Sequence, residues 1–65
     1  MTPPDPTRLQ VGTVVLLTAF DDVPEHLFEV HSIEEDCVTG VALSGPLKGE
    51  YGEPAHAMIK AVYQG

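Results

Sequence analysis

This sequence contains several stretches in which aliphatic side chains recur at every second position. In LQVGTVVLLTAF, residues 9–20, Val11, Thr13, Val15 and Leu17 alternate with a second set that is also largely apolar. A period of two and frequent β-branched residues are typical of β-strands. Because both sets are apolar, we expect this strand to be central, or to be covered on its second face by a loop.

Two further stretches of this kind predict a hairpin. In LFEVHSI, Phe28 and Val30 share one face, and Ile33 breaks the alternation, which indicates a β-bulge near Ser32. The charged turn EED leads into CVTGVALSG, where Gly40 leaves room for the close approach of a neighbouring backbone.

The C-terminal segment EPAHAMIKAVYQG allows two interpretations. Pro54 suits the first position of a helix that would place Met58, Ile59 and Val62 on one face. Alternatively, a single helical turn over 54–57 precedes a short strand, MIKAVY, that completes the sheet. We favour the strand, which gives an all-β protein of four to five short antiparallel strands with one helical turn near the C-terminus.

The order of these segments resembles that of a known group of folds. VGTVVLL is followed by a variable acidic loop, LFEVHSI, a tight turn, CVTGVAL and a closing segment with a helical turn. Over residues 9–63 this order is similar to the small SH3-like β-barrels of bacteria, the Tudor and KOW-like group. The resemblance implies a small, strongly bent antiparallel barrel that acts as a binding module. The basic residues by which KOW-type members contact RNA are missing, and two Phe and two Tyr do not plainly supply a Tudor-type aromatic cage, so neither specialised function is expected.

The size of the chain suits one small β-barrel domain, which we assign to residues 9–65. Residues 1–8 contain three prolines, and we expect them to form a flexible tail. Cys37 is the only cysteine, so no internal disulfide can form, and MTPPDPTR has neither the basic start nor the apolar core of a signal peptide. No apolar run approaches the roughly 18 residues needed to span a bilayer. We therefore expect a cytoplasmic protein of bacterial type.

The charge of the chain restricts its ligands. Ten acidic residues outnumber three scattered basic ones, for a net charge of −7, so no basic patch can form. Nucleic acids and anionic membranes are bound through clustered Lys and Arg, so we expect neither as a direct ligand. A protein partner of basic character is the natural counterpart. An acidic mimic of nucleic acid that occupies a DNA-binding protein is also compatible with this charge.

The acidic loops 20–25 and 45–53 form the predicted contact surface of a protein-interaction or accessory module. Loops on a rigid barrel carry most contacts of such domains. The candidate partner-binding residues in these loops are Asp21, Asp22, Glu25, Lys48, Glu50 and Tyr51. The first alternative is a structural homo-oligomer, in which the surplus apolar face of the first strand is buried against a second copy.

The glycine-rich stretch SGPLKGEYGEP does not fit a phosphate-binding loop. It lacks the Gly-Lys-Ser/Thr of a Walker loop and the GxGxxG spacing of dinucleotide sites, and Glu50 and Glu53 would repel anions. We interpret its glycines as turn residues, with Leu47 and Tyr51 directed inward.

Metal binding is the second alternative, and catalysis is not expected. Glu29 and His31 share a strand face, and His56 could join them to form a set of ligands for zinc or ferrous iron. The spacing does not establish this site, and we assign neither a metal nor a cofactor. Cys37 lacks a nearby positive charge to lower its pKa, so we expect a small core residue rather than a nucleophile, in a protein that is not an enzyme.

Overall fold

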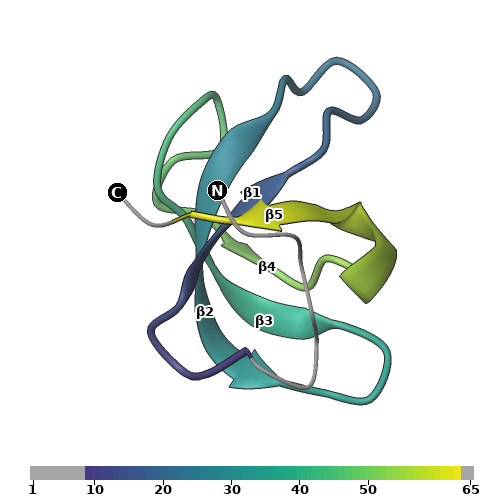
Figure 1. The fold of residues 1–65 in the computed structure, drawn as a ribbon. Helices are drawn as coiled ribbons and strands as arrows, with labels where there is room; N and C mark the ends of the chain where they lie inside the picture. Colours follow the sequence, from purple (N-terminus) through teal and green to yellow (C-terminus); the bar gives the residue numbers. More distant parts are fainter. Residues whose placement is uncertain (1–8, 64–65) are drawn as a thin grey trace.

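The computed structural model describes residues 9–63, which form one antiparallel sheet (Figure 1). The predicted flexible tail, residues 1–8, lies outside the described residues. The strands are β1 (Val14–Leu17), β2 (His26–Ile33), β3 (Val38–Ala42), β4 (Tyr51–Gly52) and β5 (Ile59–Val62). A single 3-10 turn, η2 (His56–Met58), precedes β5. The prediction of an all-β fold with one helical turn near the C-terminus is confirmed. Of the predicted strand MIKAVY, Ile59–Val62 forms β5, whereas Met58 belongs to η2.

The strand order across the sheet is β4-β3-β2-β1-β5. Every pairing is antiparallel, and β2 lies at the centre between β1 and β3. The sheet bends strongly, but its two edge strands, β4 and β5, do not pair with each other. The barrel expected from the sequence is therefore open along one side.

The bulge expected near Ser32 is present where β2 pairs with β3. Val30 lies opposite Gly40 and Ser32 lies opposite Thr39, which leaves His31 as the extra residue. Gly40 allows a close backbone approach, since a Cβ built on it would meet the carbonyl oxygen of Glu29 at 1.8 Å. Both local predictions for this hairpin are confirmed.

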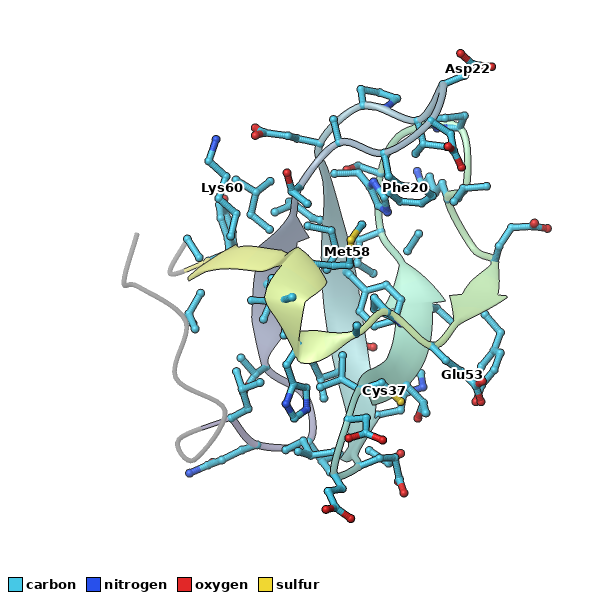
Figure 2. The ribbon with its side chains drawn as sticks, turned by 90° about the vertical axis from the view of Figure 1, so that its right-hand side faces the viewer. Phe20, Asp22, Cys37, Glu53, Met58 and Lys60 are labelled. Carbon is cyan, nitrogen blue, oxygen red and sulfur yellow. The ribbon has the colours of Figure 1, made fainter. Side chains whose placement is uncertain are left out.

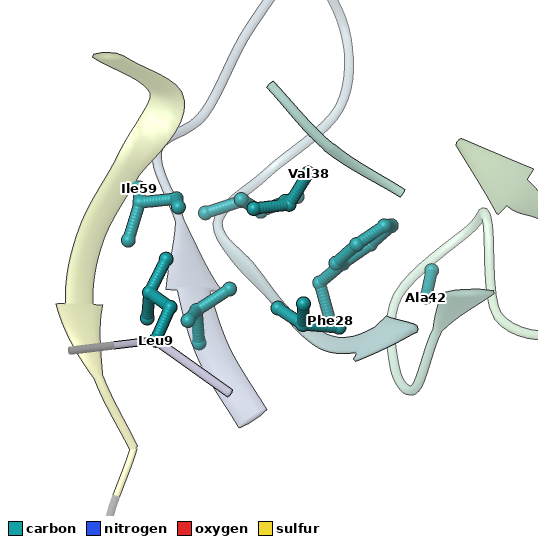
Figure 3. Packing of buried hydrophobic residues seen from close by; sticks show 8 residues of the cluster. Leu9, Phe28, Val38, Ala42 and Ile59 are labelled. Atoms are coloured by element: carbon teal, nitrogen blue, oxygen red, sulfur yellow. The ribbon is translucent and has the colours of Figure 1, made fainter. Parts of the chain in front are cut away.

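The hydrophobic core lies on the concave face of the bent sheet (Figure 3). Val15 and Leu17 of β1 and Phe28 and Val30 of β2 are buried there, as their alternation predicts. The complete set of buried apolar residues is Leu9, Val15, Leu17, Phe28, Val30, Val38, Ala42 and Ile59. Burying a large aliphatic or aromatic side chain contributes about 1.5–3 kcal/mol, so these few residues are the main source of stability.

Two details of the sequence interpretation are wrong. The first strand is only Val14–Leu17 within the predicted segment 9–20, because a turn precedes it, in which Thr13 N–H donates to the Gln10 carbonyl. Tyr51, expected to point inward, is 64% exposed, because it pairs with the outward-facing Val41. Leu47 does pack against the core, as expected.

The only helical element between residues 9 and 63 is η2, whose three residues are far too few to cross a membrane.

Candidate functional site

An open cleft of about 320 Å³ lies beside the edge strand β4. Its walls come from the loop between β1 and β2, the loop between β3 and β4, β4 itself and η2 (Figure 2). The lining residues are Leu17, Phe20, His26, Phe28, Ala42, Leu47, Glu50, Tyr51, Gly52, Glu53, Pro54 and Met58. This set joins the two loops that the sequence singled out as a contact surface.

Most of the cleft surface is apolar. Leu17, Phe28 and Ala42 belong to the core and form its floor. Phe20 from the first loop and Met58 from η2 are partly exposed and form its sides. An open cavity with apolar walls and a few polar groups is the usual form of a binding site.

Gly52 keeps the floor of the cleft accessible beside β4. A Cβ on this glycine would lie 3.6 Å from Cε2 of Phe28, an ordinary contact distance. A larger side chain at Gly52 would therefore extend over the Phe28 ring into the cleft. The absence of that side chain helps to keep the cleft open.

His26 is the buried polar residue of the cleft. Its side chain is 3% exposed, and its ring lies tilted against that of Phe20, with the ring centres 6.2 Å apart. Nδ1 lies 2.9 Å from the Pro24 carbonyl oxygen, which can only accept, so Nδ1 carries a proton and donates to it. This bond fixes the ring and, with it, the wall formed by Phe20.

The charged groups of the cleft are acidic. Glu50 and Glu53 line it, and among residues 9–63 no Lys or Arg does. The Tyr51 hydroxyl donates to Oε2 of Glu53 over 2.8 Å, and this bond is the main cause that raises the pKa of Tyr51 above its ordinary value. The cleft therefore combines an apolar interior with a negatively charged border.

The predicted partner-binding residues divide into two groups. Glu50 and Tyr51 line the cleft. Asp21 and Asp22 are both exposed in the first loop, and Figure 2 shows Asp22 at its tip, beyond Phe20.

The other two predicted residues lie elsewhere. Glu25 forms an ion pair with Lys60 of β5, on the outside of the sheet. Lys48 is exposed and does not line the cleft. The sequence analysis did not identify Phe20, His26 and Met58 as residues of the cleft. No local pattern shows that a side chain lines a cleft rather than packing in the core.

The proposed metal ligands do not come together. Nε2 of His31 lies 3.0 Å from Oε1 of Glu29, so these two are neighbours as expected. His56 instead lies beside the turn between β2 and β3, with Nε2 3.1 Å from the Cys37 carbonyl oxygen. Within residues 9–63, no three His, Cys, Asp or Glu side chains are placed to hold one metal ion. The hypothesis of a site formed by Glu29, His31 and His56 is therefore wrong.

Cys37 lies at the border of the fold and not in the core, where it was expected. It is partly buried and bridges to Ala55 just before β3 begins. Desolvation, followed by the negative charges of Glu53, Glu34 and Asp36, raises the pKa of its thiol above the ordinary value. A raised pKa leaves less thiolate at neutral pH, which is the opposite of what a nucleophile requires.

The convex face of the sheet carries a second apolar surface. Pairing across β5, β1, β2 and β3 places four aliphatic side chains in one row, which we call the outer row: Ala61, Leu16, Leu27 and Leu43. Leu43 is 37% exposed and the other three are partly buried. The outward face of an antiparallel sheet is usually polar, so this row is unusual.

Comparison of the chain with models of protein families, with curated proteins and with solved structures found no match.

Proposed function

We propose that this protein is a binding module that takes an apolar side chain of a protein partner into the cleft beside β4. The observation that carries the proposal is an open, mostly apolar cleft of about 320 Å³ whose charged lining residues are Glu50 and Glu53. An apolar anchor buried in a cavity is the usual centre of a protein–protein contact. Acidic groups at its border select Lys or Arg next to that anchor.

The net charge of the chain supports the same partner. At −7 the protein attracts basic segments at low salt, over a range of about one Debye length, roughly 30 Å at 0.01 M. Asp21 and Asp22, in the loop that also carries Phe20, add negative charge beyond one end of the cleft. The partner we propose is therefore a protein segment with an apolar side chain flanked by basic ones, in the cytoplasm.

We also assign the fold to the SH3-like barrels. The strand order β4-β3-β2-β1-β5 and a 3-10 turn directly before the last strand support this assignment. It agrees with a role in binding rather than catalysis, as does the pKa of the Cys37 thiol, which desolvation and then the acidic neighbours raise.

The test uses peptides with a central Lys-Phe-Arg or Lys-Leu-Arg and measures binding by fluorescence anisotropy. We expect the affinity to fall about tenfold between about 0.05 M and about 0.5 M NaCl, because exposed charge pairs are screened. Peptides with Glu in place of Lys and Arg should bind at least about tenfold more weakly, since like charges would meet at the cleft border. Equal binding of the acidic and basic peptides, or none by either, would overturn the proposal.

Two pairs of variants place the binding in the cleft. Gly52→Leu fills the space over Phe28 and should weaken binding at least about tenfold, whereas Gly52→Ala adds only ordinary contacts with Phe28 and Pro54 and should change the affinity little. Glu50→Gln removes a charge of the cleft and should weaken binding severalfold. Glu35→Gln makes the same change in the exposed turn after β2 and should have no effect, because Glu35 does not line the cleft.

Self-association is the second function that we propose. The observation in its favour is the outer row, four aliphatic side chains on the convex face with no charge among them. A second copy can cover this row without touching the cleft, because the two lie on opposite faces of the sheet.

A further inference from the structure

The free edge of β4 runs along the border of the cleft, and it is the basis of an inference about how a partner binds. We propose that the partner segment is extended and pairs with this edge as an additional strand, with alternate side chains entering the cleft. This inference rests on the proposed binding function and adds the backbone conformation and the side-chain pattern of the partner.

The backbone of β4 has one bonded side and one free side. Ala42 N–H donates to the Glu50 carbonyl, and Val38 N–H donates to the Pro54 carbonyl. Gly52 lies between them, opposite Gly40. Successive residues of a strand direct their N–H and C=O groups to opposite sides, so those of Tyr51 and Glu53 point away from β3.

No hydrogen bond within residues 9–63 uses these outward groups. The bonds of Glu50 and Pro54 to β3 and the pairing of Gly52 with Gly40 leave Tyr51 at a position of the ladder that is not hydrogen-bonded. Glu53 makes no backbone bond to the described residues, and none of their side chains bonds to the main chain of Tyr51 or Glu53. Figure 2 shows β4 at the margin of the molecule, with no other strand beyond it. A row of free donors and acceptors is what an added strand requires.

Side-chain directions place the cleft directly beside this edge. Tyr51 lies opposite the outward Val41 and bonds to Glu53, so both side chains are on the convex side of the sheet. These two residues nevertheless line the cleft, and we infer that they do so through their main chain. Gly52, between them, faces Phe28 on the concave side.

The alternation of a paired strand then fixes the partner's pattern. Every second side chain of the partner segment points to the concave side of the sheet. The one that enters the cleft over Phe28 and Gly52 has to be apolar, because the interior of the cleft is apolar. The residues before and after it point to the convex side, where Glu53 presents its carboxylate. Lys or Arg is therefore favoured directly next to the apolar residue, and the partner we propose is a basic, alternating segment.

Single N-methyl groups along the Lys-Phe-Arg peptide test the pairing. An N-methyl group removes a hydrogen-bond donor and blocks the approach of the neighbouring strand. In the paired peptide every second amide faces β4, and a methyl group on any one of these amides should weaken binding at least about tenfold. Methylation at the amides between them should change the affinity less than about threefold, because those amides face solvent. These intervening positions are the matched control.

Amide hydrogen exchange of the full chain, followed by NMR, is the second readout. In the free protein the amides of Tyr51 and Glu53 should exchange close to their intrinsic rates, and the bound peptide should slow both at least about tenfold. The amide of Ala42, bonded to Glu50, should be protected in both states.

The outcomes separate the two proposals. The unmethylated peptide could bind and be weakened by Gly52→Leu, while the effect of N-methylation does not alternate along the peptide and the amides of Tyr51 and Glu53 stay unprotected. In that case the strand pairing is wrong and the cleft remains the binding site. If the unmethylated peptide does not bind, the proposed function is wrong and the pairing with it.

Discussion

Gly40 and Gly52 lie opposite each other on β3 and β4, but their surroundings differ. A Cβ on Gly40 would lie 1.8 Å from the Glu29 carbonyl oxygen, in the backbone of β2, which cannot move without breaking the ladder. We predict that Gly40→Ala lowers the free energy of unfolding by about 3 kcal/mol, the upper range for overpacking. Chemical denaturation with urea measures this change.

Gly52→Ala is the matched control for this prediction. The same methyl group would meet Cε2 of Phe28 at 3.6 Å and Cδ of Pro54 at 4.0 Å, both ordinary contact distances, so we expect a change of less than about 1 kcal/mol. Equal effects of the two substitutions would contradict the close backbone approach at Gly40.

Single residues also show where prediction from sequence ends. Gly40 was correctly predicted, because a glycine inside a strand pattern indicates a close approach. Tyr51 was wrongly placed inside, since β4 is only two residues long and such a strand has no alternation from which to assign a face. Cys37 was assigned to the core from its small apolar side chain, but its place at the start of β3 leaves it partly exposed.

At the scale of elements, His56 connects η2 to the turn between β2 and β3. Its backbone N–H donates to the Asp36 carbonyl, and its ring Nε2 lies within hydrogen-bond distance of the Cys37 carbonyl. Both acceptors belong to the end of the turn between β2 and β3, so His56 holds η2 against this turn.

We predict that His56→Ala lowers the free energy of unfolding by about 1 kcal/mol, because a partly buried hydrogen bond is lost. His31→Ala removes only an exposed contact with Glu29 and should change stability by less than about 0.5 kcal/mol. Urea unfolding of both variants at one pH provides the comparison. A larger loss for His31→Ala than for His56→Ala would show that η2 is not held in this way.

Most elements were predictable because each has a local signal. The bulge appears as a break in alternation at Ile33, and the turn before β5 appears as Pro54 followed by an apolar strand pattern. The cleft has no such signal. Its walls come from two loops, β4 and η2, which are far apart in the sequence, so their arrangement depends on the bend of the whole sheet.

For the whole molecule, two opposing terms decide whether copies associate. Each chain carries a net charge of −7, so two copies repel each other at low salt. The outer row offers an uncharged apolar surface on the convex face, and burying it in a dimer would release about 25 cal/mol per Å². Salt screens the repulsion but not the apolar contact.

We therefore predict association that strengthens with salt, measured by sedimentation equilibrium at about 0.05 M and about 0.5 M NaCl. The dissociation constant should fall about tenfold or more at the higher salt. Leu27→Glu, in the middle of the outer row between Leu16 and Leu43, should give a monomer at both salts.

Val11→Glu is the control for this last prediction, because it changes the charge equally at a position that is 70% exposed and outside the row. It should retain the salt-dependent association, and circular dichroism should show that both variants are folded. A monomeric mass of the unmodified chain at both salts and at millimolar concentration would rule out the outer row as a self-association surface. It would leave the cleft on the opposite face as the remaining binding surface, since a partner there meets the acidic border rather than the aliphatic row.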